Sequence, residues 1–338
     1  MSKQPGPPLA LTMGEPGGVG PEITANAHQS LKNGGPVFFL IGDPAYFRRR
    51  GIDFCEIFTP AEAAATFPRA LPLLDVGAAV TARPGTADPA NAAAVIASIE
   101  RAVSLSLAGE AAGVVTNPIQ KASLIASGFR FPGHTEFLEA LTQSAPMPAV
   151  MTRGAVMMLA GPFLKTVPVT IHQSVVQAAG TLAPEMIVRK GVILAEALQQ
   201  DFSINSPRIA VSGLNPHAGE NGAMGDEESR VIAPAIRMLR DKGVDAFGPL
   251  PADTMFHEES RARYDAALCM LHDQALIPVK TLAFHEAVNV TLGLPIVRTS
   301  PDHGTALDIA GRGEARADSL IAALRLAQDI SNARRSRR

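Results

Sequence analysis

Short apolar runs alternate with longer helical segments along this chain, and no other feature limits its fold as strongly. Strands separated by helices of ten or more residues are typical of α/β layers with a largely parallel sheet. Long helices are expected over 88–108, 184–200, 226–243 and 318–332, with shorter ones opening at Pro21, after Asn117-Pro118 and over 174–180. Strands are expected at Leu9–Met13, Val37–Ile41, Leu71–Leu74, Gly113–Thr116, Arg208–Ser212, Ala266–Leu271 and Val288–Leu292.

The middle third departs from this alternation. The runs 149–158 and 166–171 follow each other directly and predict antiparallel neighbours in a mixed sheet. A length of 338 residues suggests two domains at about 100–200 residues each. No linker of distinctive composition separates them, so we expect the chain to pass between domains more than once. The first domain is expected to hold residues 1–128 and 306–338, and the second residues 129–305.

Composition excludes several classes of protein. Lys and Arg number 30 against 32 Asp and Glu, and the resulting net charge of −2, with two Tyr and no Trp, argues against nucleic acid as the main partner. No apolar run approaches the roughly 18 residues of a membrane span. Cys55 and Cys269 cannot form a disulfide framework, so a reducing, cytoplasmic compartment is expected. The basic end, Arg334 to Arg338, is expected to be a frayed, solvated terminus.

Three of the eight histidines stand just beyond three different predicted strands: His172, His217 and His272. Neutral imidazoles from separate elements are a common way to build a metal site with open coordination positions. Each histidine alone is better explained as a hydrogen-bonded loop residue, and it is the trio at strand ends that favours a metal. Asp273 could orient a ligand, whereas Cys269 is discounted as a zinc ligand because it lies within an apolar strand.

Other polar groups suit an anion. Glycines in the loop Gly14–Gly20 could expose backbone N–H groups to an anion, or could simply form a tight strand–helix turn. His134 and Thr135 at the start of a helix could bind an oxyanion, although Thr135 could equally cap that helix. Lys280, Asn289 and Arg298 lie among apolar runs, where a cation either pairs with carboxylate or phosphate or is ordinary surface charge.

A compact polar loop, Asp302–Gly311, precedes the last helix and is expected to turn into a short helix. Its chemistry suits a ribose or an adenine. The residues expected to contact a cofactor there are Asp302, His303, Gly304, Thr305, Leu307 and Asp308.

Taken in order, these motifs resemble the 4-hydroxythreonine-4-phosphate dehydrogenase family of vitamin B6 biosynthesis. The resemblance runs from Leu11 to the last helix. It also extends to the isocitrate and isopropylmalate dehydrogenases through HGTALDIAG. The segments that carry it are TMGEPGGVGPEI (12–23), VTNPIQK (115–121), GHTE (133–136), GLNPHAGENGAMGDEE (213–228), LHDQ (271–274) and VNVTLGLPIVRTSPDHGTALDIAG (288–311).

The resemblance implies α/β/α layers of the isocitrate dehydrogenase type, with two intertwined domains around a central cleft. It implies a homodimer in which both subunits build each active site, with the second domain carrying the metal and the dimer contacts. It makes His172, His217 and His272 the metal ligands, and His134, Thr135, Lys280, Asn289 and Arg298 the substrate contacts. Asp253 and Asp273 are expected to line the same site. Ala275 stands where the family is expected to carry glycine.

The activity implied is NAD-dependent, or NADP-dependent, oxidation of 4-phosphooxy-L-threonine at C3, followed by decarboxylation to 3-amino-2-oxopropyl phosphate. A divalent metal, such as zinc, cobalt, magnesium or manganese, would stabilise the alkoxide. The expected catalytic residues are Lys280, Asp273 and Asp253, and Lys280 either transfers the proton or pairs with an anionic group.

Alternatives remain open at this stage. A dehydrogenase for erythronate or threonate 4-phosphate, or for an aromatic dihydrodiol, would share the same framework. A metal-dependent hydrolase or lyase would also use three histidines, and a phosphate-binding protein without catalysis would not need them.

Overall fold

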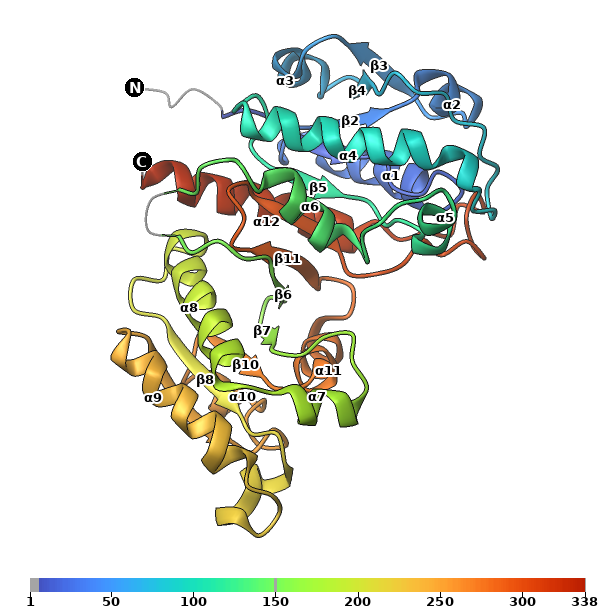
Figure 1. The fold of residues 1–338 in the computed structure, drawn as a ribbon. Coiled ribbons are helices and arrows are strands. Elements are labelled where there is room, and N and C mark those ends of the chain that lie inside the picture. The colour runs from blue at the N-terminus through green and yellow to red at the C-terminus, as the bar shows by residue number, and fades with distance from the viewer. Residues whose placement is uncertain (1–5, 149–150, 338) are drawn as a thin grey trace. The chain divides into compact units, whose positions relative to one another are not determined.

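The computed structural model describes residues 6–148 and 151–337, and Figure 1 traces the chain. Two compact units are present. Unit 1 holds the described residues up to 146 together with 294–336, and unit 2 holds the described residues between 147 and 293. The sequence predicted boundaries at 128/129 and 305/306, whereas the two units divide at 146/147 and 293/294. The boundaries were misplaced because no linker of distinctive composition marks either crossing.

Unit 1 is built on parallel strands in the order β3-β4-β2-β1-β5-β12. In β1, Leu11 pairs with Leu40 on one side and Val115 on the other, and all of β1 is buried. Burial on both faces is typical of a central parallel strand. The strands are Leu9–Thr12 (β1), Phe38–Gly42 (β2), Phe54–Ile57 (β3), Leu71–Asp75 (β4), Val114–Thr116 (β5) and Arg298–Pro301 (β12).

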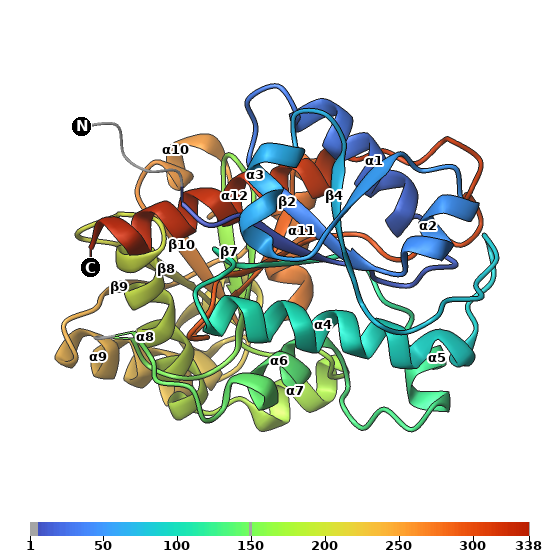
Figure 2. The ribbon, with the colours of Figure 1, turned by 90° about the horizontal axis from the view of Figure 1, so that it is seen from above.

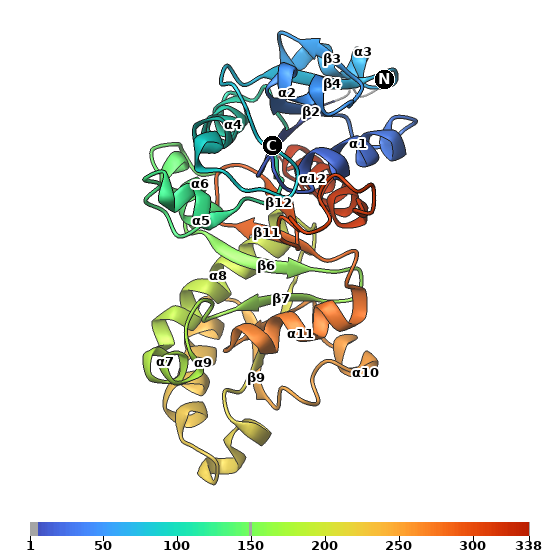
Figure 3. The same cartoon turned by 90° about the vertical axis from the view of Figure 1, so that its right-hand side faces the viewer.

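Helices cover both faces of this sheet. Figure 3 shows α4 and α6 on one side of the strands and α1 and α12 on the other. Asp43 caps α2 by accepting a hydrogen bond from Ala45 N at 2.8 Å. The helices are Gly20–Leu31 (α1), Pro44–Arg49 (α2), Ala63–Thr66 (α3), Ala92–Leu107 (α4), Lys121–Ala126 (α5), His134–Thr142 (α6) and Asp318–Ser336 (α12), with 3-10 turns at Pro60–Glu62 and Pro89–Asn91.

The segment Pro89–Leu107, which includes α4, is long and apolar enough to cross a membrane by length and composition alone. Figure 2 shows α4 running beside the strands of unit 1. Ser98 lies within this helix and is fully buried; its Oγ accepts from Met13 N at 3.0 Å and donates to Ile41 O at 2.8 Å. Contacts of this kind with the ends of β1 and β2 are those of a core helix.

Unit 2 carries the mixed sheet that the sequence predicted, in the order β11-β6-β7-β10-β8-β9. β6 is antiparallel to both β7 and β11, whereas β7, β10, β8 and β9 are mutually parallel neighbours. The strands are Val156–Ala160 (β6), Lys165–Pro168 (β7), Arg208–Ser212 (β8), Asp245–Leu250 (β9), Ala266–Cys269 (β10) and Val288–Leu292 (β11).

The helices of unit 2 also form two layers, with α11 on one face of the sheet and α8 and α9 on the other (Figure 3). On the α11 face, Ala275, Leu276 and Val279 pack against Leu159 and Cys269 in one apolar cluster. The helices are Val175–Thr181 (α7), Pro184–Gln200 (α8), Ala233–Asp241 (α9), Glu258–Arg261 (α10) and His272–Ala283 (α11), with a 3-10 turn at Pro216–Gly222 and a π-helical turn, Glu228–Ile232, that leads into α9.

The structure corrects three local predictions and adds elements that the sequence did not predict. Asn117 does not cap α5, which begins at Lys121; instead, the buried Asn117 amide donates to Thr12 O and Thr24 Oγ1. The loop after β12 forms turns rather than a short helix, and the next helix is α12. α12 continues to Ser336, so Arg334 and Arg335 are helical rather than frayed. The strands β3, β9 and β12 and the helix α11 were not predicted, and α11 contains Pro278, which breaks the usual helix pattern.

Candidate active site

The three candidate metal ligands all belong to unit 2 and follow adjacent parallel strands. His172 follows β7, His272 opens α11 just after β10, and His217 lies in the loop after β8. Because carboxyl ends of parallel strands meet at one edge of a sheet, the fold directs all three histidines to the same edge. Open α/β sheets bind their ligands at this edge.

Hydrogen bonds tie these strand ends together. Gln274 on α11 donates from Nε2 to Gly213 O at 3.0 Å, and its Oε1 accepts from Leu271 N at 3.0 Å. Ser212, the last residue of β8, accepts from Met270 N at 3.1 Å, and Thr170 donates to Met270 O at 2.7 Å. The segments that carry the three histidines are therefore held in fixed register.

His272 has a defined orientation. Its Nδ1 lies 2.7 Å from Asp273 Oδ1, and because an ionised carboxylate only accepts hydrogen bonds, Nδ1 carries the proton. This pairing leaves Nε2 as the nitrogen suited to a metal, which is the arrangement that orients many metal-bound imidazoles. Asp273 also lines a cavity of about 540 Å³ together with Asp253, so the two carboxylates that the family resemblance placed in one site do share a cavity.

His217 sits on an unusual backbone. The five consecutive residues 217–221 all have positive φ, namely 52°, 50°, 76°, 41° and 57°. Four of them are not glycine, and the left-handed conformation costs each such residue roughly 1–2 kcal/mol. Surrounding contacts must therefore hold this loop in place.

The donor set suits a divalent cation in kind, because three neutral imidazoles and nearby carboxylates are common metal ligands. Among the described residues of one chain, however, no three His, Cys, Asp or Glu side chains lie close enough to share an ion. His172 and His217 are exposed, and the His272 side chain is 38% exposed. The fold therefore brings the three histidines to one edge without closing them around a site.

Cys269 is fully buried within β10, and burial raises the pKa of its thiol. A buried protonated thiol is a poor metal ligand, which agrees with its exclusion on sequence grounds.

Lys280 and Asn289 lie on the same face of the unit 2 sheet. Asn289 pairs with Leu159 on β6, and Leu159 belongs to the apolar cluster under α11, the helix that carries Lys280. Paired residues of antiparallel strands point to the same face, so Asn289 lies on the α11 side. Lys280 follows His272 by eight residues on that helix, which separates them by about 12 Å along its axis.

The remaining substrate candidates gather in unit 1. Arg298, at the start of β12, is 4% exposed and donates from Nη2 to Thr116 Oγ1 at 2.7 Å. Its burial lowers its pKa to about 10. Burial, followed by the charges of Arg298 and Lys121, also holds the pKa of His134 well below its usual range, so His134 is neutral at pH 7.

His134 opens α6, and Thr135 follows it half-buried. The Nε2 atom of His134 is buried without a hydrogen-bond partner in the described chain. A neutral imidazole with an unpartnered ring nitrogen, close enough to Arg298 and Lys121 to feel their charges, has the chemistry to bind an anionic oxygen. We call His134, Thr135, Lys121 and Arg298 the anion cluster.

The candidate cofactor loop packs against the first glycine-rich loop. Thr305 O accepts from Val19 N at 3.0 Å, and a Cβ on Gly18 would lie 2.7 Å from Thr305 O. A Cβ on Gly17 would lie 1.9 Å from Thr86 O. These glycines therefore serve close backbone packing, which favours the tight-turn interpretation of Gly14–Gly20. The other candidate residues, Asp302, His303, Gly304, Leu307 and Asp308, line the same turn-rich segment.

Three polar residues near the candidate groups were not predicted from the sequence to have a role. Lys121 lies within the quoted segment VTNPIQK but was given no role. Lys190 on α8 donates to Pro168 O at 3.1 Å and Val169 O at 2.8 Å, directly after β7, and burial lowers its pKa to about 8. Glu228 is 6% exposed beneath the His217 loop. Only the tertiary contacts distinguish these residues from ordinary surface charges.

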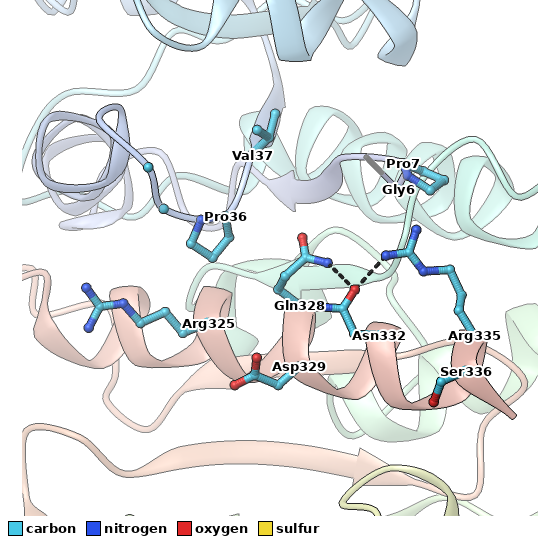
Figure 4. A pocket seen from close by; sticks show the side chains of 12 residues that line it. Gly6, Pro7, Pro36, Val37, Arg325, Gln328, Asp329, Asn332, Arg335 and Ser336 are labelled. Atoms are coloured by element: carbon cyan, nitrogen blue, oxygen red, sulfur yellow. Dashed lines mark hydrogen bonds between the residues drawn. The ribbon is translucent and has the colours of Figure 1, made fainter. Parts of the chain in front are cut away.

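A cavity of about 1010 Å³ lies elsewhere in unit 1, between α12 and the segments that lead into β1 and β2. Figure 4 shows Gln328 and Arg335 directed at Asn332, to whose Oδ1 both donate. Pro7 and Val37 precede their strands, so this cavity adjoins the amino ends. It is distinct from the strand ends that carry the candidate residues of unit 2 and from the anion cluster.

Comparison with known proteins gives a consistent result. A family model described as "Pyridoxal phosphate biosynthetic protein PdxA" matches residues 36–327. The 4-hydroxythreonine-4-phosphate dehydrogenase of Caulobacter vibrioides is 54% identical over 326 residues, which span 96% of this chain and 97% of that protein.

Solved structures agree with these matches. The 4-hydroxythreonine-4-phosphate dehydrogenase of Klebsiella pneumoniae superimposes with a TM-score of 0.84 at 36% identity, over 98% of this chain and 99% of that one. A terephthalate 1,2-cis-dihydrodiol dehydrogenase from Burkholderia xenovorans reaches a TM-score of 0.64 at 29% identity, over 96% and 98%. The predicted α/β fold and the family resemblance are both confirmed, and the chain belongs to the PdxA family of pyridoxal phosphate biosynthetic proteins.

Proposed function

We propose that this protein is an NAD-dependent 4-hydroxythreonine-4-phosphate dehydrogenase that oxidises 4-phosphooxy-L-threonine at C3 and releases CO₂ to give 3-amino-2-oxopropyl phosphate. The observation that carries this proposal is the 54% identity, over nearly the whole chain, to a protein of that name. The dihydrodiol dehydrogenase is less similar in both sequence and structure, which favours the phosphorylated substrate.

The anion cluster supports a substrate with a phosphate and a carboxylate. Arg298 has Thr116 as a hydrogen-bond partner, and this bond fixes its guanidinium beside His134. In the proposal, Arg298, His134 and Thr135 bind one anionic end of the substrate. Lys121 adds a second positive charge.

His172, His217 and His272 are proposed to hold a divalent cation, zinc, cobalt, magnesium or manganese, that when bound would stabilise negative charge on the substrate oxygen. Since one chain does not gather the three, we propose a homodimer whose partner completes each site. Exposed apolar residues on α11 support such an interface, because Ile277 is 60% exposed on the same helix as His272. Val175 and Val176 on α7 follow His172 and are also exposed.

Lys280 is proposed to accept the proton of the C3 hydroxyl, and NAD, when bound, would accept the hydride from C3. Loss of CO₂ then returns an electron pair to the adjacent carbon, which takes up a proton. Asp273 and Asp253 are proposed to act within the same site, where Asp273 orients His272. Asn289 is proposed to bind the substrate from the same sheet face as Lys280.

The alternative role of Lys280 is charge pairing with the substrate, and two variants separate the roles. Lys280→Arg keeps the positive charge but cannot accept a proton at ordinary pH. If Lys280 transfers the proton, both Lys280→Arg and Lys280→Met lose kcat; if it only pairs charges, Lys280→Arg retains most of it.

The loop 302–308 is proposed to contact NAD, with NADP as the alternative cofactor. The two cysteines form no disulfide, which supports the cytoplasm as the location. A nucleic acid or a membrane is not proposed as a partner.

The direct test is reduction of NAD, followed at 340 nm, by metal-loaded protein supplied with 4-phosphooxy-L-threonine. Parallel reactions contain erythronate 4-phosphate, threonate 4-phosphate, an aromatic cis-dihydrodiol, or NADP in place of NAD. A chelator-treated sample tests the metal. Turnover with the threonine compound supports the proposal, whereas turnover with another substrate alone assigns the protein to that reaction. Substrate loss without nicotinamide reduction would indicate a hydrolase or lyase.

A further inference from the structure

The loop between β8 and α9 carries His217 on a backbone that the sequence alone does not stabilise. Residues 217–221 form a left-handed turn, and four of these five residues are not glycine. L-residues avoid this conformation, so a free loop would relax out of it. The left-handed turn therefore requires a specific restraint.

Glu228 provides contacts of the required kind. Its carboxylate is buried, and Oε1 accepts from Leu214 N at 2.9 Å and from Asn215 N at 2.8 Å. Oε2 accepts from Asn215 Nδ2 at 3.0 Å. Both oxygens are therefore used by the stretch that leads directly into the turn.

The same carboxylate also fits against the turn itself. A Cβ on Gly219 would lie 2.6 Å from Glu228 Oε2, which means that only a glycine leaves room for the carboxylate at this point. Gly219 has φ +76° and lies two residues after His217. Glu228 thus accepts hydrogen bonds from the loop before the histidine and lies close to Gly219 after it.

We propose that Glu228 is a positioning residue that holds the left-handed turn and thereby sets the place of the His217 imidazole. Charge-assisted hydrogen bonds from backbone N–H groups to a buried carboxylate are strong and directional, so they can oppose the strain of the turn. The proposal rests on the proposed function of His217 as a ligand, and Glu228 does not itself touch the metal or the substrate.

Glutamine is an informative replacement, because it keeps the size of the side chain and removes its charge. If its oxygen faces Leu214 N and Asn215 N, its NH₂ group faces the Asn215 amide, which also donates to Glu227 Oε2 at 2.7 Å. If the Asn215 amide turned over to accept from this NH₂ group, its oxygen would face the Glu227 carboxylate, and neither of these two groups can donate a hydrogen bond. Every arrangement of Glu228→Gln therefore loses at least one hydrogen bond.

Glu227 is the matched control. It is the neighbouring carboxylate, it contacts the same Asn215 amide, and this hydrogen bond is the main cause that lowers its pKa. Its hydrogen bond goes to the side chain of Asn215, whereas the backbone N–H groups of Leu214 and Asn215 donate to Glu228, so Glu227→Gln changes the same charge without removing the restraint.

The experiment compares Glu228→Gln, Glu228→Ala, Glu227→Gln and His217→Ala in the full-length protein. Three quantities are measured: hydrogen exchange over 213–225, Zn²⁺ or Co²⁺ affinity by calorimetry, and kcat and KM. We expect Glu228→Gln to accelerate exchange in this loop and to weaken metal affinity and lower kcat by at least tenfold. KM is expected to change less than threefold, with Glu228→Ala more severe and Glu227→Gln within twofold of wild type.

Circular dichroism controls for loss of fold, and Glu228→Gln keeps the test valid if Glu228→Ala does not fold. Wild-type exchange, metal affinity and kcat in Glu228→Gln would overturn the proposal. His217→Ala separates this outcome from failure of the proposed function. If His217→Ala binds metal normally, the ligand role of His217 is wrong; if it loses metal while Glu228→Gln behaves as wild type, only the positioning role is wrong.

Discussion

The two units place their candidate residues in opposite environments. In unit 1, Arg298 is buried and hydrogen-bonded to Thr116, and the neutral His134 lies within range of its charge. In unit 2, His172 and His217 are exposed and belong to no set of three donors in the described chain. The members of the anion cluster are thus neighbours within one chain, whereas one chain does not gather the three histidines among its described residues. Under the proposed function, metal binding would therefore need a partner subunit and anion binding would not.

The largest effect is expected in unit 1, for a variant of the anion cluster. Arg298→Met removes the buried guanidinium, and kcat/KM should fall by about 10³-fold, because loss of one buried charged partner costs several kcal/mol in binding. The fold should survive, since burying an unneeded charge is itself unfavourable. Steady-state kinetics and thermal unfolding check both points.

Arg208→Met is the control for Arg298→Met. Arg208 forms an ion pair with Asp265 at 3.3 Å, but its side chain is 44% exposed in unit 2. Kinetics should stay close to wild type, since exposed ion pairs contribute little. An equal loss of activity in both arginine variants would contradict a specific role for Arg298.

The second prediction tests whether two subunits together build the proposed site in unit 2. His272→Ala and Lys280→Met should each be inactive as pure proteins. If each site takes His272 from one subunit and Lys280 from the other, a mixed dimer keeps one intact site, and a randomly mixed 1:1 population should recover about a quarter of wild-type activity. Co-expression followed by an activity assay measures this recovery. No recovery in isolated mixed dimers would place both residues in the same subunit's site.

A third, smaller effect concerns Lys190, which contacts the backbone just after β7. Its folded pKa of about 8 lies below the ordinary value of 10.5, so the folded state binds fewer protons than the unfolded state between these values. Stability from this group therefore rises as pH increases from about 8 towards 10.5, and the penalty on the charged amine is fully present below pH 8.

Denaturant unfolding of wild type and Lys190→Met at several pH values from 7 to 9.5 measures this effect. The free energy of unfolding of wild type, relative to Lys190→Met, should increase with pH above 8. A difference that stays constant across this range would show that Lys190 titrates at its ordinary pKa.

The smallest effect is expected at the carboxyl end. Removal of residues 334–338 should leave kcat and KM unchanged, because Arg335 lines the cavity beside α12 and Arg334 donates to the backbone of Leu294, which is not a candidate residue. Arg334 donates to Leu294 O at 3.4 Å, and losing such a bond costs about 1 kcal/mol or less. A large loss of activity would show that the end of α12 takes part in function.

Local pattern predicted much of the fold. β1, β2, β5 and β8 were predicted because each contains a short apolar run bounded by turn residues, and α8 because its apolar residues recur at helical spacing. The strand β3 was missed because Cys55 and Glu56 are exposed and interrupt any apolar run. The helix α11 was not predicted because Pro278 lies inside it and because His272, its first residue, was interpreted as a metal ligand at the end of a strand.

For the site, motifs identified which residues to examine, but not their surroundings. The motifs that contain His134 and Arg298 did not predict that these two residues are close in space, because they are far apart in the chain. Lys121 was overlooked for the same reason. Burial lowers the pKa of His134, and so do the charges of Arg298 and Lys121, which belong to other elements of the fold.

By itself, the sequence determined the α/β class, the family and the identity of the candidate residues, since these depend on local periodicity and on motifs that lie within short stretches. Only the tertiary structure decided which residues are neighbours and which groups are buried. It also revealed the left-handed turn at His217 and its contact with Glu228, because φ angles and desolvation depend on atoms brought together from distant parts of the chain.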